Sequence, residues 1–173
     1  NKSSGKQGRA LAIELSARGY EIIYIHSASI DHIPGLDNVS FHSSNDLKNK
    51  ILENINNTDA IFMTAAVSDF TVKKSSGKIS RSNGNITLEF IPNEDIIATI
   101  KSSYPEIKCI AFSAQVDDEL NFNKINTKNV DYLVINNILK NNFGSDANKV
   151  SIIDHQHLIF ESEELDKNEI SRD

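Results

Sequence analysis

Apolar residues along the chain follow two patterns, helical spacing and nearly continuous runs, and the two patterns alternate. From about Ser4 to Arg18 the apolar residues have helical spacing, and Gly19 is well placed to follow the end of that helix. From Tyr20 to His26 the residues are nearly all apolar or β-favouring, which predicts a strand. The most apolar run, Ala60 to Val67, predicts a strand that is buried on both faces.

The rest of the pattern predicts more elements of both kinds. Short apolar runs predict strands, and apolar stripes that follow a polar cap predict helices. The predicted strands are Val39–His42, Ile86–Phe90, Ile107–Ala114 and Asp131–Asn136; the predicted helices are Asn45–Asn56, capped by Ser44, Pro92–Lys101 and Asp117–Lys128; and a hairpin pairs Val150–Asp154 with Leu158–Phe160. The charged tail, Glu163–Asp173, is weakly helical in its pattern.

Helices that alternate with strands predict an α/β fold with a parallel sheet and right-handed crossovers. We expect a Rossmann-like, mostly parallel sheet with helices on both faces, a flap loop and a C-terminal hairpin. A chain of 173 residues is long enough for one domain, which we expect to span residues 1–173. Because a domain rarely begins on a functional-looking loop, we expect that at least one further strand precedes Asn1.

Composition excludes several classes of protein. Hydrophobic residues make up 39% of the chain, and no run approaches the roughly 20 apolar residues of a membrane span. The net charge of -6 argues against a nucleic-acid surface, which needs a basic patch. The single cysteine, Cys109, lies in a predicted core strand and has no internal disulfide partner, which fits a reducing cytoplasm.

The stretch from Asn1 to Gly8 is a polar, glycine-containing loop that leads directly into the first predicted helix. A helix N-terminus has unpaired N–H groups and the positive end of the helix dipole, so it suits a phosphate. The same residues also suit ordinary capping, with Ser3 or Ser4 as the N-cap. From this stretch alone, capping and phosphate binding are equally good interpretations.

Other polar residues also suit an anionic ligand. Asp69 follows the most apolar strand, at the edge where parallel sheets bind ligands. The polar stretch from Thr71 to Gly84 carries Lys78 among other basic residues; it is either a solvated loop or a mobile cationic flap. Lys124 and Lys128 stand one helical turn apart.

Motifs of several enzyme classes are missing. Gly5-x-x-Gly8 is not the dinucleotide fingerprint G-x-G-x-x-G, and no G-x-S-x-G of a serine hydrolase exists. His155 and His157 lack a third ligand, so we expect no metal site made by protein side chains. No nucleophile–base pair stands out. Activation of a carboxylate by a nucleotide needs none, because charge neutralisation and alignment suffice.

Several motifs in order resemble those of the phosphopantothenate–cysteine ligase family, the C-terminal domain of a bacterial bifunctional flavoprotein of coenzyme A biosynthesis. The resemblance covers nearly the whole chain. The matching stretches are Asn1-x-Ser3-Ser4-Gly5-Lys6-x-Gly8, Ala65-Ala66-Val67-Ser68-Asp69-Phe70, Lys78-Ile79-Ser80-Arg81, Asn93-Glu94-Asp95-Ile96-Ile97, Ala111-Phe112-Ser113-Ala114, Ile135-Asn136-Asn137 and Phe143-Gly144-Ser145-Asp146. The chain departs from the family at Gln7, where the family has methionine, at Glu94, where it has proline, and at Arg81, where it has lysine. The resemblance also implies a first strand and a Gly-rich loop before Asn1.

The resemblance implies a reaction and site residues. The carboxylate of 4′-phosphopantothenate attacks the α-phosphate of CTP, and the amine of L-cysteine then displaces CMP from the acyl-cytidylate. Asn1 and Lys78 are the implied catalytic residues: Asn1 orients the intermediate and Lys78 closes over it. The implied nucleotide-binding residues are Ser3, Ser4, Gly5, Lys6, Ala65, Asp69, Glu94, Asp95, Ile96, Ile97, Phe112, Lys124 and Lys128.

The resemblance also implies partners. Mg²⁺ should accompany CTP, and FMN belongs only to a flavin-dependent decarboxylase domain or partner. Members of the family are dimers, and Ile86–Phe90 is the candidate for a shared edge. The alternative interpretation is a non-catalytic Rossmann-type module that binds NAD(P).

Overall fold

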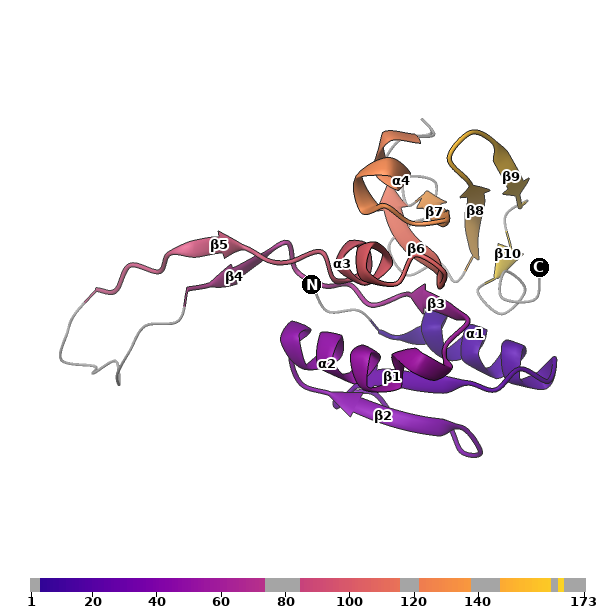
Figure 1. Ribbon diagram of the computed structural model, residues 1–173, viewed down its shortest axis with the longest axis horizontal. Helices are drawn as coiled ribbons and strands as arrows, with labels where there is room; N and C mark the ends of the chain where they lie inside the picture. Colours follow the sequence, from indigo (N-terminus) through magenta and orange to yellow (C-terminus); the bar gives the residue numbers. More distant parts are fainter. Residues whose placement is uncertain (1–3, 74–84, 116–121, 138–146, 163–164, 167–173) are drawn as a thin grey trace.

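The computed structural model describes residues 4–73, 85–115, 122–137, 147–162 and 165–166 (Figure 1). Its elements follow in chain order. They are α1 Lys6–Ala17, β1 Ile23–Ser27, β2 Asp37–Phe41, α2 Ser44–Asn54, η1 Ile55–Asn57, β3 Ala60–Met63, β4 Phe70–Val72, β5 Phe90–Pro92, α3 Ile96–Ser103, β6 Lys108–Gln115, α4 Phe122–Lys128, β7 Tyr132–Asn137, β8 Ala147–Ile153, β9 Leu158–Glu161 and β10 Leu165–Asp166.

The strands form three separate sheets in the described part of the chain. The largest has the order β10-β8-β7-β6-β3, with β9 also paired to β8. Within it β3, β6 and β7 run parallel, whereas β8 is antiparallel to β7 and to β9. A second sheet pairs β1 with β2 in parallel, and a third pairs β4 with β5 in antiparallel. This arrangement confirms the predicted α/β fold and the C-terminal hairpin.

Helix α1 begins differently from the prediction. Its N-cap is Gly5 rather than Ser4, and Gly5 has a φ of 69°, a left-handed conformation that favours glycine. Ser4 still helps, because its Oγ accepts a hydrogen bond from the Lys6 N–H at 3.4 Å. The other possible cap, Ser3, lies outside the described residues. At the other end Gly19 has a φ of 91° and its N–H donates to the Ser16 carbonyl, which confirms its predicted place.

Helix α2 is capped one residue earlier than predicted. The Oγ of Ser43, not of Ser44, accepts a hydrogen bond from the Asp46 N–H at 3.2 Å. In return the Asp46 carboxylate accepts from the His42 N–H at 2.9 Å. These reciprocal bonds resemble a capping box and determine where the helix starts.

The main hydrophobic core lies between the largest sheet and helices α2, α3 and α4. Its buried residues include Ile51 of α2, Ile100 of α3, Ile125 of α4 and Leu133 of β7. Cys109 belongs to this core and is fully buried, as the sequence predicts. Helix α1 packs elsewhere, in a smaller cluster with Tyr24. In the described chain, no helix is both long and apolar enough to cross a membrane.

Strand β3 differs most from its prediction. It ends at Met63, so Ala65 to Val67 lie outside the strand, and its residues alternate between exposed and half-buried. Phe62 remains 39% exposed. The prediction of burial on both faces is therefore wrong for this strand. The physical reason is that β3 is an edge strand with β6 as its single strand partner among the described residues.

Other predicted boundaries also need correction. Thr71 and Val72 form part of β4 and pair with β5, so this end of the predicted flap loop is a strand. The predicted strand Ile86–Phe90 begins only at Phe90. Helix α3 starts at Ile96, with Asp95 as its N-cap. In the tail predicted to be weakly helical, Leu165–Asp166 forms β10.

Candidate functional site

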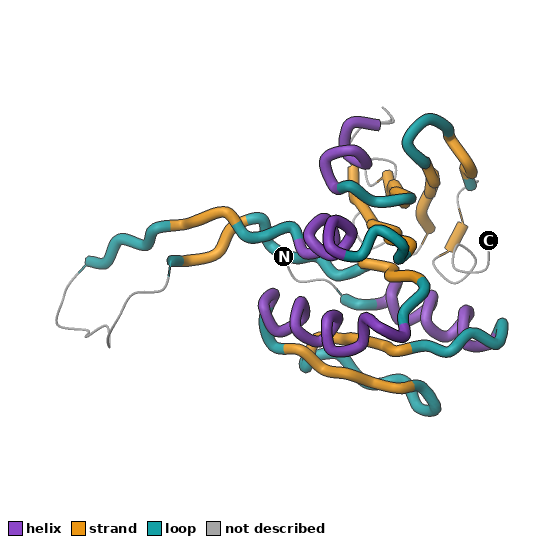
Figure 2. The backbone as a smooth tube through the Cα atoms, viewed as in Figure 1, coloured by secondary structure: helices purple, strands orange, loops and turns teal. Residues whose placement is uncertain are grey.

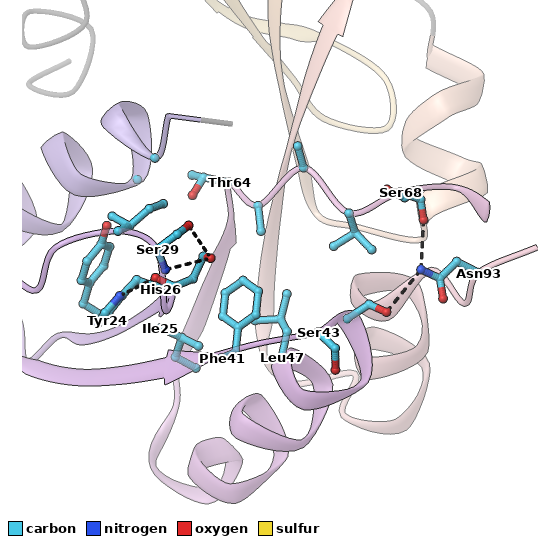
Figure 3. Close-up of a pocket in the computed structure, with 18 of the residues that line it drawn as sticks. Tyr24, Ile25, His26, Ser29, Phe41, Ser43, Leu47, Thr64, Ser68 and Asn93 are labelled. Atoms are coloured by element: carbon cyan, nitrogen blue, oxygen red, sulfur yellow. Dashed lines mark hydrogen bonds between the residues drawn. The ribbon is translucent and has the colours of Figure 1, made fainter. Parts of the chain in front are cut away.

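Two neighbouring hollows lie at the carboxyl ends of β1 and β3. We call the first, about 430 Å³, the α1 hollow. It lies between the N-termini of α1 and α2, the end of β1 and the segment 64–68 (Figure 3). Its lining residues in the described chain include no charged side chain but many hydroxyls: Ser27, Ser29, Ser43, Ser44, Thr64, Ser68 and Thr71.

Close contacts hold the walls of the α1 hollow together. A Cβ on Gly8 would lie 2.5 Å from Thr64 Oγ1, so α1 approaches the segment after β3 through a glycine. The Asn93 amide donates to the Ser68 carbonyl at 3.0 Å and to Ser44 Oγ at 3.3 Å (Figure 3). Asn93 therefore links β5, the segment 64–68 and the start of α2.

The second hollow, about 210 Å³, is the α3 hollow, between the segment 63–69, the N-terminus of α3 and strand β6. It contains most of the described residues that the resemblance assigned to nucleotide binding. They are Ala65, Asp69, Glu94, Asp95, Ile96, Ile97, Phe112 and Lys128. These residues come from four separate stretches of sequence, so the fold brings together what the motifs predicted only piece by piece.

An ion pair fixes Glu94 at the rim of the α3 hollow. Lys48 Nζ of α2 contacts both carboxylate oxygens of Glu94, at 2.7 and 2.8 Å. The Lys48 ammonium and the Thr99 hydroxyl hold the pKa of Glu94 below its usual range. Glu94 therefore stays ionised at neutral pH. The pair also joins α2 to the start of α3.

Asp95 is engaged at both oxygens. Its Oδ1 caps α3 by accepting from the Ala98 N–H at 3.2 Å, and its Oδ2 contacts Lys128 Nζ at 3.0 Å. Lys128 thus lies in the hollow with its charge already paired to a carboxylate. A phosphate bound there would compete with Asp95 for the ammonium.

The remaining predicted site residues fall into three groups. Gly5 lines the α1 hollow, whereas Ser4, Lys6 and Lys124 line neither hollow. Asn1, Ser3 and Lys78 lie outside the described residues.

Sequence reasoning missed several residues at this site. His26, Ser29 and Thr64 line the α1 hollow and were not singled out, although all three lie at or just beyond the carboxyl end of β1 or β3. That position was the available signal, since parallel sheets bind ligands there. Lys48 had no such signal, because its partner Glu94 is 46 residues away.

Protein side chains offer little for a metal ion here. No group of three or more histidine, cysteine or carboxylate side chains gathers as a metal site within the described ranges. His155 and His157 lie at the exposed hairpin tip, where His155 contacts Asn126 and His157 contacts Asp154.

The parallel strands, the crossovers and the hollows at the strand ends define a Rossmann-like α/β domain. The profile of the DNA/pantothenate metabolism flavoprotein C-terminal domain family matches residues 1–173, and the chain belongs to that family.

Individual relatives agree with this assignment. The chain is 33% identical over 159 residues to the coenzyme A biosynthesis bifunctional protein CoaBC of Bacillus subtilis, covering 88% of this chain and 39% of that protein. It is 30% identical over 185 residues to a protein named cysteine/cysteine sulfinic acid decarboxylase from an unknown prokaryotic organism, covering 100% of this chain and 50% of that protein. The chain thus spans half or less of the length of these relatives.

Two solved structures share the fold. The DNA/pantothenate metabolism flavoprotein of Streptococcus pneumoniae has a TM-score of 0.78 at 20% identity, covering 99% of this chain and 86% of that one. The C-terminal domain of a coenzyme A biosynthesis bifunctional protein CoaBC has a TM-score of 0.76 at 24% identity, covering 99% of this chain and 81% of that one.

Proposed function

We propose that this chain is the ligase domain that joins 4′-phosphopantothenate to L-cysteine, with CTP as the activating nucleotide. Family membership and the name of the Bacillus subtilis relative support a place in coenzyme A biosynthesis. The observation that carries the proposal is the α3 hollow, where residues implied for nucleotide binding converge from four stretches of the chain.

The chemistry needs alignment and charge neutralisation more than a protein nucleophile. The carboxylate oxygen of phosphopantothenate bonds to the α-phosphorus of CTP, and pyrophosphate leaves with the electrons of the broken P–O bond. The cysteine amine then bonds to the acyl carbon, loses a proton, and CMP leaves with the carboxylate oxygen. Both reactants of the first step are anions, so their repulsion must be offset.

The described residues suit these tasks. Ile96, Ile97 and Phe112 offer an apolar floor against which a cytidine packs. The N-terminus of α1 at Gly5 and that of α3 offer N–H groups to phosphates. Lys128 supplies a positive charge once a phosphate replaces Asp95 as its partner. Asp69 lines the same hollow, which supports its proposed contact with the nucleotide.

Mg²⁺ fits this site as a companion of CTP. Magnesium is commonly held by phosphate oxygens with only one or two carboxylates from the protein. The α3 hollow has carboxylates at its rim but no ready-made cage of three ligands in the described chain. The ion would supply charge neutralisation to the phosphates.

Pyrophosphate release tests the proposal. The protein, incubated with phosphopantothenate, cysteine and one nucleotide, is expected to release pyrophosphate with CTP and little with ATP. Equal use of CTP and ATP would refute the assignment of CTP. Binding of NAD(P) in calorimetry, without pyrophosphate release, would instead support a non-catalytic dinucleotide-binding module.

Two substitutions separate the steps of the reaction. Lys78→Gln is expected to slow formation of the acyl-cytidylate about tenfold or more, because it removes a positive charge from the flap. Asn1→Asp is expected to let the intermediate form and to impair its conversion to the amide. Quench-flow with and without cysteine measures both steps, and wild-type rates in both variants would contradict these roles.

We also propose that the domain forms a homodimer through the β4–β5 ribbon, which extends away from the rest of the described fold (Figure 1). Residues paired across an antiparallel ladder share a face, and here Phe70 pairs with Pro92 and Val72 with Phe90. Phe70 is 59% exposed and Phe90 63%. The other face carries the Lys73–Glu89 ion pair, at 2.9 Å. A two-stranded ribbon is barely stable alone, so its apolar face needs a partner.

A second copy of the ribbon supplies a matching apolar face across a two-fold axis. Phe90→Asp is therefore expected to convert the dimer to a monomer in light scattering, whereas Lys73→Gln on the opposite face keeps the dimer. A dimer that survives Phe90→Asp unchanged would show that the interface lies elsewhere.

Further partners follow from the relatives. The relatives' names, which include "bifunctional protein" and "decarboxylase", and the flavoprotein family to which the chain belongs support a flavin-dependent decarboxylase, with FMN, as a fused domain or partner. The buried thiol of Cys109, whose pKa is raised by burial, fits a location in the reducing cytoplasm.

A further inference from the structure

Asn93 lies where three parts of the candidate site meet. Its backbone N–H donates to the Asp69 carbonyl at 2.7 Å, which extends the ladder of β4 and β5 by one pair. Its side-chain amide donates to the Ser68 carbonyl at 3.0 Å and to the Oγ of Ser44, the first residue of α2, at 3.3 Å (Figure 3). One half-buried residue thus holds the base of the β4–β5 ribbon, the segment after β3 and the start of α2.

The segment 65–68 lies between two strands and belongs to neither. Strand β3 ends at Met63, and β4 begins at Phe70. Within the segment the Val67 N–H donates locally, to the Ala65 carbonyl at 3.1 Å. The hydrogen bond from the Asn93 amide to the carbonyl at the end of the segment therefore ties it to an element outside itself. The opposite end of the ribbon extends away from the sheets (Figure 2).

This segment is also the wall between the two hollows. All four of its residues line both the α1 hollow and the α3 hollow, and so does Asn93. A shift of the wall therefore changes the shape of both hollows at once. The family resemblance assigns the four residues after Asn93 to nucleotide binding and gives Asn93 itself no role.

The β4–β5 ribbon depends on the same residue. In the sequence Lys78, the flap residue of the proposed reaction, falls between the two strands of the ribbon. The pair of Asp69 with Asn93 is the hydrogen-bonded pair of this ladder that lies next to the wall. Because the Asn93 side chain also binds the wall, the ribbon and the wall are held together at this point.

We propose that Asn93 is a positioning residue, whose side-chain amide keeps the β4–β5 ribbon and the wall between the hollows in one relation, so that the two reactants of the first step meet in alignment. A misplacement of about 1 Å can slow a reaction about 100-fold, even when the changed residue lies away from the reacting atoms. The kinetic part of this proposal rests on the proposed ligase function, whereas the structural part does not.

Amide hydrogen exchange tests the structural part without any substrate. The amides of residue 93 and Lys73 donate to Asp69 and Glu89 across the ribbon. In Asn93→Ala both amides are expected to lose about tenfold or more in protection, whereas the amide of Ile110 in the largest sheet keeps its protection. Unchanged protection in the ribbon would overturn the proposal. An equal loss at Ile110 would also overturn it, because it would indicate a general loss of stability.

Steady-state kinetics test the other part. Asn93→Ala is expected to lower kcat for pyrophosphate release about tenfold or more and to change KM for CTP less than about threefold, because alignment is lost while the nucleotide contacts remain. Asn93→Asp keeps the shape of the side chain, but a carboxylate has no N–H to donate, so kcat should fall in this variant too. A change confined to KM for CTP, or wild-type kinetics in both variants, would overturn the role.

Asn38→Ala is the matched control. The Asn38 amide also donates to two carbonyls, of Ile33 at 2.9 Å and of Leu36 at 2.7 Å, but Asn38 lines neither hollow. We expect this variant to lower the free energy of unfolding and to keep the wild-type kcat. An equal fall of kcat in Asn38→Ala would show that Asn93 acts through stability rather than alignment. If the wild type releases no pyrophosphate, the proposed function fails, and the exchange experiment alone decides the role of Asn93.

Discussion

Asp131→Ala is expected to lower the free energy of unfolding by about 3 kcal/mol. The Asp131 carboxylate accepts from the Cys109 N–H at 2.8 Å, and contacts Lys101 Nζ at 2.8 Å and Lys108 Nζ at 3.1 Å. Asp131 is 17% exposed and Lys101 13%. Removal of the carboxylate therefore leaves the mostly covered Lys101 ammonium without its counter-charge, although the carbonyls of Pro105 and Ile107 still accept from it at 2.8 Å. Urea denaturation at pH 7 measures the loss.

Lys108→Ala is the matched control. The Lys108 side chain is 63% exposed, so its contact with Asp131 is screened by solvent and we expect a loss below about 1 kcal/mol. A large loss for Lys108→Ala, or a small one for Asp131→Ala, would show that the buried pair does not stabilise the fold in this way.

The pH dependence of stability follows from the same group. Burial raises the pKa of Asp131, but hydrogen bonds from the Cys109 N–H, Lys101 and Lys108 together outweigh burial and hold the pKa below its usual range. A lowered pKa in the folded state means stability that is complete above the unfolded pKa of about 3.9 and lost as the pH falls through the folded value. The difference between wild type and Asp131→Ala should therefore shrink below about pH 4.

Gly5→Ala is expected to reduce both stability, by about 1 to 2 kcal/mol, and nucleotide affinity, by about tenfold. Gly5 has a φ of 69°, a conformation that costs energy for any residue with a Cβ. That Cβ would also lie 2.5 Å from Ile30 Cδ1. Gly5 is the N-cap of α1 and lines the α1 hollow. Strain there is therefore expected to disturb the N–H groups that we propose as phosphate ligands.

Gly19→Ala is the control for Gly5→Ala. Gly19 has a φ of 91°, but its added Cβ meets no atom within 4 Å, and it lies at the other end of α1. The free energy of unfolding of Gly19→Ala should fall by about 1 kcal/mol through backbone strain, and its affinity for CTP should stay at the wild-type value. Thermal unfolding and calorimetry compare the two variants. Equal affinity for CTP in the two variants would show that the N-terminus of α1 is not part of the binding site.

The alternation of patterns was enough to predict the α/β fold, because apolar spacing reports directly which face of an element is buried. It was not enough for β3, where Phe62 has the composition of a core strand but lies at an open edge. It also missed the start of β5, because pairing between Val72 and Phe90 depends on how the intervening chain brings them together. The local composition of a strand does not indicate which other strand it pairs with.

The candidate site shows the same limit. Ala65, Glu94 and Phe112 were predicted from separate motifs, and the fold brings all three to one hollow. The ion pair of Glu94 with Lys48 could not be predicted, since it depends on the packing of α2 against the start of α3. The pairing of Lys128 with Asp95 was likewise invisible in the sequence, and it changes Lys128 from a free cation to one that must exchange partners.

The fate of the carboxylate oxygen tests the central claim most directly. The protein is incubated with CTP, cysteine and phosphopantothenate labelled with ¹⁸O in its carboxylate, and the products are analysed by mass spectrometry. If the carboxylate attacks the α-phosphorus, CMP carries one ¹⁸O atom and pyrophosphate carries none. Label in inorganic phosphate or pyrophosphate, or CMP without label while the amide forms, would contradict activation through an acyl-cytidylate.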